Sequence, residues 1–243
     1  MDQNAIKEIV GREAVEALVK SGMKLGLGTG STAMPAVRHV GLLLREGRLK
    51  NIMAVPTSFQ TLMECEKWDI PVFTLNSKEI GGKLDLTIDG ADEVDGKNRL
   101  VKGGGGALLI EKIVAYSSAS YAIVVDESKL RESLGVKFPV PVEVVPEARI
   151  TVTMALLDLG AEVVLREAVR KAGPVISEHG NLLLDARFKE EIDPQFLEDE
   201  INRIPGVVEN GFFTFRAGRS SSGKPLFPRI FIGYEDGRVE QRH

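Results

Sequence analysis

Short apolar runs alternate with helical patterns through the first half of the chain, and this alternation limits the folds open to it. The runs have the length of strands and lie at 23–27, 52–55, 72–75, 84–88 and 121–125. Parallel neighbouring strands need crossover connections, usually helices, which then cover both faces of the sheet. The alternation therefore predicts an α/β fold with a doubly wound, mostly parallel sheet.

The pattern changes near Phe138, where closely spaced prolines discourage helix and mark a crossing between structural units. Beyond it, the periodicity predicts a helix near 148–159 and another that opens at Asp193 followed by a proline. We expect these elements to form a small inserted α+β domain over 139–206. The main α/β domain, which carries every candidate site residue, would then comprise 1–138 and 207–243.

Two strand-like runs follow the predicted insertion, at 212–215 and 230–233. Both are candidates to return to the main domain. The run between them, from Arg219 to Pro225, is rich in serine and has the composition of a mobile loop.

The composition indicates a folded protein without a nucleic-acid or membrane partner. Of the 243 residues, 43% are hydrophobic and 27% charged, and the net charge of -4 offers no basic face for an anionic polymer or membrane. Apolar runs such as 40–44 are too short to cross a bilayer, and the acidic start does not resemble a signal peptide. The single cysteine, Cys65, cannot form an intramolecular disulfide. We therefore expect a cytoplasmic protein.

A glycine-rich turn, Gly28-Thr29-Gly30-Ser31-Thr32, follows the first predicted strand and precedes a helix. Hydroxyls and backbone donors would gather there at the positive end of a helix dipole, which favours a binding site for phosphate or carboxylate. An ordinary tight turn with a helix cap is the alternative. Because the turn lacks a P-loop lysine and the dinucleotide spacing, nucleotide binding is disfavoured.

A second motif, Asp89-Gly90-Ala91-Asp92-Glu93, directly follows an apolar strand. Ligands of parallel sheets gather where the strands end at their carboxyl edge, so these carboxylates are candidates to share or donate protons. A solvated acidic turn is the alternative, and the short spacing does not match an EF-hand calcium loop.

Lys102 precedes four consecutive glycines, Gly103 to Gly106. Glycines sacrifice chain entropy, so a run of them suggests close approach of the backbone to a ligand. A helical segment begins immediately afterwards, which favours a second anion site at a helix start over a flexible linker. Lys102 would add a positive charge beside it.

Glu111 lies early on this helix, one turn from Leu108 and one turn from Ala115. A semi-apolar face would desolvate its carboxylate and make it a better base, whereas a surface glutamate that complements the helix dipole is the alternative. The three histidines, His39, His179 and His243, lack the spacing of metal ligands. We expect no metal and no cofactor.

Together these motifs resemble type A ribose-5-phosphate isomerases in wording and order. The resemblance continues through 137–144 to 204–208 and covers most of the chain. It implies an aldose–ketose isomerase of the non-oxidative pentose phosphate pathway, active in carbohydrate metabolism on ribose 5-phosphate and ribulose 5-phosphate. It also implies a doubly wound domain with a small insertion, no cofactor, and a homodimer or homotetramer.

The resemblance assigns the proton-shuttling base to Glu111, with Asp89 as our candidate for ring opening and Lys102 for stabilising an enediolate. The implied substrate-binding residues are Thr29, Gly30, Ser31, Thr32, Asp89, Gly90, Ala91, Asp92, Lys102, Gly103, Gly104, Gly105, Lys129 and Lys7.

The chain departs from the family pattern at 216–229, which is longer than the usual connection, and at Leu109-Ile110, which replaces a more polar pair. Two other classes of function stay open. One is another sugar-phosphate enzyme, such as an amino-sugar-phosphate deaminase or a phosphosugar lactonase. The other is a non-enzymatic sugar-phosphate sensor, but no helix-turn-helix segment or basic patch precedes the Gly28 motif, which favours an enzyme.

Overall fold

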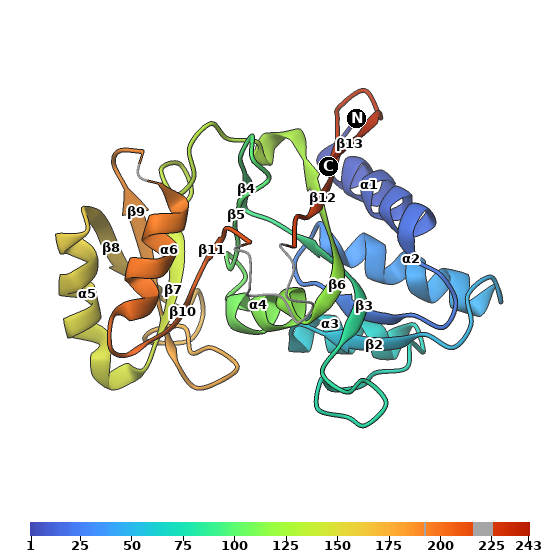
Figure 1. The fold of residues 1–243 in the computed structure, drawn as a ribbon, viewed down its shortest axis with the longest axis horizontal. Coiled ribbons are helices and arrows are strands. Elements are labelled where there is room, and N and C mark those ends of the chain that lie inside the picture. The colour runs from blue at the N-terminus through green and yellow to red at the C-terminus, as the bar shows by residue number, and fades with distance from the viewer. Residues whose placement is uncertain (192, 216–225) are drawn as a thin grey trace. The chain divides into compact units, whose positions relative to one another are not determined.

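The computed structural model describes residues 1–191, 193–215 and 226–243, so the loop expected at 219–225 lies outside the described residues (Figure 1). Contacts divide the chain into two units. Unit 1 consists of Met1–Ala91, Ile110–Lys129 and Phe215–His243, and unit 2 of Asp92–Leu109 and Leu130–Thr214. The domain boundaries expected at 139 and 206 stay a prediction.

Unit 1 is built on a six-stranded sheet with the order β13-β12-β6-β3-β1-β2. All neighbours run parallel except β13, which pairs antiparallel with β12. The predicted α/β fold with a mostly parallel sheet is thereby confirmed. The strands are β1 (Lys24–Leu27), β2 (Met53–Pro56), β3 (Leu84–Gly90), β6 (Ser118–Asp126), β12 (Arg229–Gly233) and β13 (Val239–Arg242).

Helices cover both faces of this sheet. Leu25 and Leu27 of β1 belong to a core shared with α1 and α2, whereas the alternate residue Gly26 faces Val114 of α4. This alternation is the two-residue period of a strand buried on both sides. The helical elements of unit 1 are α1 (Gln3–Leu18), α2 (Ala33–Arg45), α3 (Phe59–Lys67), η1 (Glu127–Lys129) and most of α4 (Leu108–Tyr116).

Unit 2 contains antiparallel sheets, as expected for a small α+β fold. A four-stranded sheet has the order β10-β7-β9-β8, and a three-stranded sheet the order β11-β5-β4. The strands are β4 (Glu93–Val94), β5 (Leu100–Val101), β7 (Val140–Val144), β8 (Ala161–Leu165), β9 (Leu182–Phe188), β10 (Val207–Asn210) and β11 (Phe212–Phe213). Its helical elements are η2 (Pro146–Ala148), α5 (Arg149–Asp158) and α6 (Pro194–Arg203), and the last two match the expected helices.

Two expectations about strands need correction. The run at 72–75 forms only a single bridge, from Val72 to Ala54, because a turn closed by the Ser77 N–H on the Thr74 carbonyl ends the extended segment. The run at 212–215 forms a strand only at Phe212–Phe213, which is β11 and pairs with β5 inside unit 2, and only its last residue, Phe215, belongs to unit 1. The run at 230–233 does return, as β12.

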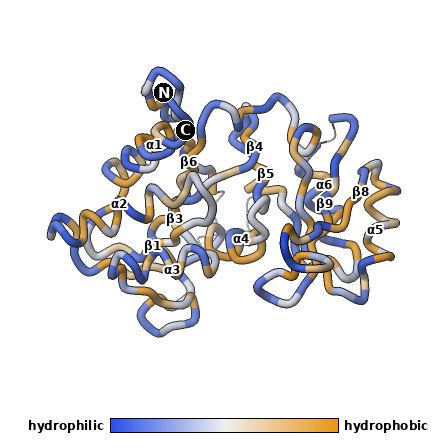
Figure 2. The backbone as a smooth tube through the Cα atoms, turned by 180° about the vertical axis from the view of Figure 1, so that it is seen from behind, coloured by the Kyte–Doolittle hydropathy of each residue, from blue (hydrophilic) through white to orange (hydrophobic). Residues whose placement is uncertain are grey.

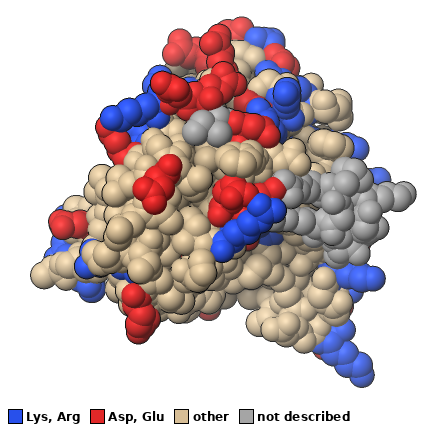
Figure 3. Space-filling model, turned by 60° about the vertical axis from the view of Figure 1, so that its left-hand side comes forward, with Lys and Arg blue, Asp and Glu red and all other residues tan. Residues whose placement is uncertain are grey.

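Helix α5 carries an exposed apolar stripe. Ile150, Met154 and Leu157 are 54%, 60% and 52% exposed and lie four and three residues apart, on one side of the helix. Much of α5 is orange in Figure 2, which marks hydrophobic residues. Figure 3, which brings forward the side of Figure 1 that holds α5, shows a broad area with few charged side chains. Among the described residues, no helix is both long and apolar enough to span a membrane.

Gly26 is glycine for a steric reason. A Cβ there would lie 2.0 Å from the Thr87 hydroxyl and 2.5 Å from Val114 Cγ1. The Thr87 hydroxyl cannot easily move away, because it shares a 2.6 Å hydrogen bond with the Ser118 hydroxyl. The absence of a side chain at Gly26 therefore allows β1, β3 and α4 to pack closely against one another.

We expect Gly26→Ala to lower the free energy of unfolding by about 1–3 kcal/mol, because overpacking forces the neighbouring side chains or backbone to shift. Urea denaturation followed by circular dichroism measures the change. Gly96→Ala is the control, since a Cβ at Gly96 meets no atom within 4 Å. Equal midpoints for the two variants would contradict the steric explanation.

Candidate active site

The turn between β1 and α2 presents free backbone donors at the start of a 13-residue helix. The N–H groups of Ala33 and Met34 both donate to the Gly30 carbonyl, at 3.1 Å each. The N–H groups of Ser31 and Thr32 make no hydrogen bond within the described part of the chain. Such unused donors at the positive end of a helix suit an anion.

Lys7 brings a positive charge to the same turn. It lies on α1, and its Nζ donates to the Ser31 hydroxyl at 2.9 Å. Lys7 has no ion pair with any described residue, so its charge is not neutralised by a carboxylate. The predicted Lys7 and Ser31 are thus brought together from segments 24 residues apart.

A cluster of hydroxyls that the sequence analysis did not predict fastens this turn to the start of α3. Thr29 Oγ1 donates to Ser58 Oγ at 2.7 Å and lies 2.7 Å from Thr57 Oγ1. Thr61 Oγ1 donates to the Gly28 carbonyl at 2.7 Å. The Thr29 side chain is therefore engaged within the protein. The only sequence signal was a run of hydroxyl residues at a helix start.

Asp89 lies at the end of β3 and is fully buried. Its Oδ1 accepts the N–H groups of Gly90 at 2.7 Å and Thr29 at 3.1 Å, which fixes the carboxylate. Gly28 has to be glycine here, because a Cβ would lie 2.0 Å from that same oxygen. The first glycine of the turn therefore makes room for the acid of the neighbouring strand.

Glu111 is 5% exposed on α4, which excludes the alternative of a surface glutamate. Its charge and that of Asp89 both raise the pKa of Tyr121, although burial of the phenol is the largest cause. Both carboxylates therefore lie close to one buried ring, which packs on Phe215 at 5.5 Å between centroids. Tyr121 stays protonated at neutral pH and is a neighbour that the sequence analysis missed.

The glycine run in unit 2 is a fixed loop and not a linker. The Gly104 N–H donates to Asp92 Oδ2 at 2.7 Å, and a Cβ on Gly104 would lie 2.6 Å from the other oxygen of Asp92. Gly103 has a φ of +98°, and its Cβ would lie 2.8 Å from Leu108 Cβ. Gly105 follows on the exposed side of this loop.

Arg166 holds the carbonyl side of the same loop and had no part in the sequence analysis. Its Nη1 donates to the carbonyls of Gly103 at 3.1 Å and Gly104 at 3.2 Å. The guanidinium is itself oriented by Asp185 through two hydrogen bonds. A planar, bidentate pair of this kind positions the loop more strictly than a lysine would.

Lys102 follows β5 and is 2% exposed. Its Nζ lies 5.6 Å from the centre of the Phe213 ring, and its backbone N–H donates to the Gly211 carbonyl at 2.9 Å. Glu93, by contrast, is structural, because it accepts the N–H groups of Gly135 at 2.8 Å and Phe138 at 2.9 Å.

Lys129 ends η1 in unit 1 and is half-buried. Within the described residues it has no ion pair or side-chain hydrogen bond. The preceding turn is closed locally, since Ser128 N–H donates to Asp126 Oδ1 at 3.0 Å. Lys129 therefore keeps a positive charge available to a ligand.

The predicted residues fall on both units. Unit 1 holds Lys7, Thr29 to Thr32, Asp89 to Ala91, Glu111 and Lys129, and unit 2 holds Asp92 and Lys102 to Gly105. One unit boundary divides the acidic motif between Ala91 and Asp92. Another lies between Leu109 and Ile110, so that it separates the glycine run from Glu111.

The described residues contain no group of three or more His, Cys, Asp or Glu side chains placed to hold a metal ion. His39 instead lies 2.9 Å from Glu16. Burial raises the pKa of the Cys65 thiol to about 12, aided by the charges of Glu64 and Glu66, so it is not a thiolate at neutral pH. That the protein needs no metal or cofactor stays a prediction.

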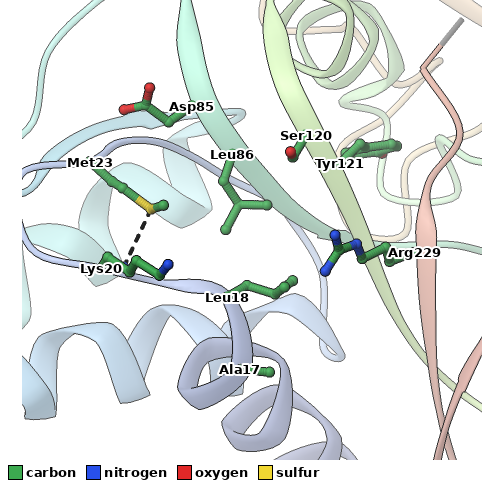
Figure 4. Close-up of a pocket in the computed structure, with 9 residues that line it drawn as sticks. All are labelled: Ala17, Leu18, Lys20, Met23, Asp85, Leu86, Ser120, Tyr121 and Arg229. Atoms are coloured by element: carbon green, nitrogen blue, oxygen red, sulfur yellow. Dashed lines mark hydrogen bonds between the residues drawn. The ribbon is translucent and has the colours of Figure 1, made fainter. Parts of the chain in front are cut away.

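A pocket of about 260 Å³ lies at the opposite, amino edge of the unit 1 sheet (Figure 4). It is lined by the end of α1 and the beginnings of strands, with Asp85 on β3, Ser120 on β6 and Arg229 on β12. None of the predicted site residues lines it. Because ligands of parallel sheets gather at the carboxyl edge, this general rule favours the candidate site around Asp89 over this pocket.

Comparison with known proteins decides the family. The family model for ribose 5-phosphate isomerase A (phosphoriboisomerase A) matches residues 53–225. The chain belongs to the ribose 5-phosphate isomerase A family. This confirms the resemblance drawn from the motifs and the assignment of the chain to the enzymes.

Individual relatives of this family match along nearly the whole chain. Ribose-5-phosphate isomerase A of Treponema denticola is 49% identical over 99% of both chains, and that of Treponema pallidum is 51% identical over 100% of this chain and 94% of the relative. The solved structure from Methanocaldococcus jannaschii has a TM-score of 0.87 and 42% identity, and covers 99% of both chains. A D-ribose-5-phosphate isomerase in complex with phospho-erythronic acid has a TM-score of 0.90 and 36% identity over both full chains.

We expect Gly28→Ala to lower kcat/KM for ribose 5-phosphate by about 100-fold, because the added Cβ displaces the Asp89 carboxylate and small misplacements in an active site are costly. A coupled spectrophotometric assay on folded protein measures it. Gly26→Ala is the control, since its added Cβ also clashes with a residue of β3, but with Thr87 and not with Asp89. Equal activity losses in the two variants would show that only packing is at stake.

Proposed function

We propose that this isomerase interconverts ribose 5-phosphate and ribulose 5-phosphate through an enediolate, with Glu111 as the base that shuttles the proton. The reaction would serve the non-oxidative pentose phosphate pathway in the cytoplasm. Family membership supports the reaction. The observation that carries the mechanism is the buried Glu111, which shares a desolvated region with Asp89 in unit 1.

The phosphate end of the substrate would bind at the turn after β1. Support comes from the two unused N–H groups of Ser31 and Thr32, the Ser31 hydroxyl and the Lys7 ammonium. These donors combine a helix terminus with a compact charge, both of which favour a phosphate group. Lys129 would contribute a further charge to a phosphate or sugar oxygen.

Ring opening breaks the bond between C1 and the ring oxygen, and it needs a group that accepts the proton of the C1 hydroxyl and delivers a proton to the ring oxygen. We assign this role to Asp89, whose Oδ1 is held by two backbone N–H groups. Asp92, which accepts the Gly104 N–H, would orient sugar hydroxyls.

The open-chain aldehyde then exchanges a proton between adjacent carbons. Glu111 removes the C2 proton to form the 1,2-enediolate and returns it to C1, while the proton of the C2 hydroxyl passes to O1, so that C2 becomes the carbonyl of the ketose. Burial makes a carboxylate a stronger base by removing water from its charged form. Lys102 and the N–H groups of the glycine loop would stabilise the enediolate oxygen, a role suited to donors that are already fixed. The hold of Arg166 on Gly103 and Gly104 supports this assignment.

The relative solved in complex with phospho-erythronic acid offers a probe for this proposal. That ligand is a phosphorylated sugar acid, so it pairs a phosphate with a carboxylate. We infer that this chain binds it too, with the phosphate at Ser31 and Thr32. A deaminase or lactonase would share the phosphate seat, but family membership favours the isomerase over both and over a non-enzymatic sensor.

The decisive experiment is Glu111→Gln in chelator-treated protein. The amide cannot accept the proton, so turnover of ribose 5-phosphate should fall by about two to four orders of magnitude while phospho-erythronic acid still binds. In deuterated water, the wild type should place deuterium at C1 of the ketose and the variant should not. Coupled assays, calorimetry and mass spectrometry provide the readouts.

The matched control is Glu79→Gln, an exposed glutamate of the same unit, which should keep wild-type turnover. Normal turnover and exchange in Glu111→Gln would remove Glu111 as the base and make Asp89 the next candidate. A wild type that binds ribose 5-phosphate without converting it would favour the sensor.

We also propose that the chain forms a homodimer or homotetramer. The exposed stripe of Ile150, Met154 and Leu157 supports this, because a row of apolar side chains on one helix face suits contact with a second copy. Light scattering after gel filtration should show an oligomer for the wild type and a smaller species for Met154→Glu. Val169→Glu, at a 99% exposed position outside α5, should keep the wild-type mass. A monomeric wild type would contradict the proposal.

A further inference from the structure

The side chain of Gln60 occupies one of the donors of the phosphate-binding turn. Gln60 is the second residue of α3, follows the capping Ser58 by two positions, and is exposed. Its Oε1 accepts the Gly30 N–H at 3.0 Å. No motif of the sequence pointed to this contact, and no step of the mechanism above uses it.

Three consecutive N–H groups thus differ in their state. Gly30 donates to Gln60, whereas Ser31 and Thr32 have no acceptor among the described residues. A phosphate that binds the two unused donors places its oxygens beside the Gln60 carboxamide oxygen. Two acceptor oxygens without a proton between them repel each other, so this arrangement cannot persist once phosphate is bound.

The backbone of α3 cannot move away to relieve this conflict. Its start is held to the turn by the bond from Thr61 Oγ1 to the Gly28 carbonyl and by that from Thr29 to Ser58. The change must therefore occur in the Gln60 side chain. A carboxamide carries an acceptor and two donors on the same carbon, so rotation about its last bond replaces the oxygen by the NH₂ group.

We propose that Gln60 determines specificity for the phosphate group: its carboxamide holds the Gly30 N–H in the free enzyme and turns to donate from Nε2 to the bound phosphate. The rotation also frees the Gly30 N–H, so phosphate gains two donors in one step. This inference rests on the proposed function, in which the turn after β1 binds the phosphate.

The consequence is that the enzyme prefers a phosphorylated sugar, because an unphosphorylated sugar does not cause Gln60 to turn. Without a phosphate, the Gly30 N–H stays bonded to Gln60, and neither of the two donors is offered. The contribution of Gln60 therefore appears in KM for ribose 5-phosphate and not in the proton transfer at Glu111.

Two substitutions distinguish a Gln60 that donates a hydrogen bond to phosphate from a Gln60 that only ties the turn after β1 to α3. Gln60→Glu keeps the shape and the accepting oxygen but has no donor, and it places a negative charge beside the phosphate. Gln60→Leu removes both functions without adding charge. We expect KM for ribose 5-phosphate to rise by about tenfold in Gln60→Leu and by more in Gln60→Glu, because hydrogen bonds to charged groups are the stronger ones. kcat should change by less than about twofold.

The matched control is Gln195→Glu. Gln195 occupies the same second position of a helix, α6 in unit 2, after the capping Asp193, and α6 carries none of the candidate site residues. It should keep the wild-type KM. Melting temperatures of the two Glu variants should stay near that of the wild type, since an acid in the first helical turn is favourable. That of Gln60→Leu should stay near it too, because the replaced side chain is exposed.

A direct measurement on the wild type needs no substitution. Titration with inorganic phosphate should shift the NMR signals of the Gly30 amide and of the Gln60 side-chain NH₂ together. If Gln60 only ties the loop to α3, phosphate shifts the Gly30 amide signal but leaves the Gln60 side-chain signal in place, which overturns the proposal.

Different results would contradict the role of Gln60 and the proposed function. If the wild type converts ribose 5-phosphate but both Gln60 variants match its KM, only the role of Gln60 is wrong. If the wild type does not convert ribose 5-phosphate, the proposed function is wrong, and the phosphate titration still decides whether the Gln60 side chain turns.

Discussion

The close approach of β1 and β3 at Gly28 and Asp89 is the constraint on which the rest of the site depends. Without a Cβ at position 28, the Asp89 carboxylate enters the space beside β1 and accepts the N–H groups of Thr29 and Gly90. One buried acid is thereby bound to both loops that carry the unit 1 part of the site. Its position follows from backbone geometry, so it requires no flexible side chain to hold it.

A second consequence of this packing is that two helix starts meet at one turn. α2 begins at the turn itself, and α3 is fastened to it by the hydroxyls of Thr29, Ser58 and Thr61. The positive ends of both helices and the Lys7 charge act on the same place, which makes it electrostatically suited to phosphate. In unit 2, Arg166 and Asp92 hold the glycine loop from its carbonyl and its N–H side.

Much of the fold could be predicted from local patterns, and the candidate site residues were chosen from the same patterns. The strands at 84–88 and 121–125 and the helix after Asp193 follow from periodicity and capping, which depend only on neighbouring residues. The run at 72–75 has the same apolar letters but makes only one bridge, because pairing depends on a partner strand and the chain turns at Ser77. The placement of β11 beside β5 depends likewise on a long-range partner.

The sequence by itself determined the alternation of strands and helices, the glycine and acidic motifs at the strand ends, and the family. These are read from residues close together along the chain, where the physical rules are local. Only the tertiary structure decided which distant groups meet: Lys7 with Ser31, Gln60 with Gly30, Arg166 with the glycine loop, and Tyr121 with Asp89 and Glu111. The physical reason is that a hydrogen bond or a charge interaction depends on distance in space, which the chain sets only when its helices pack on the sheet.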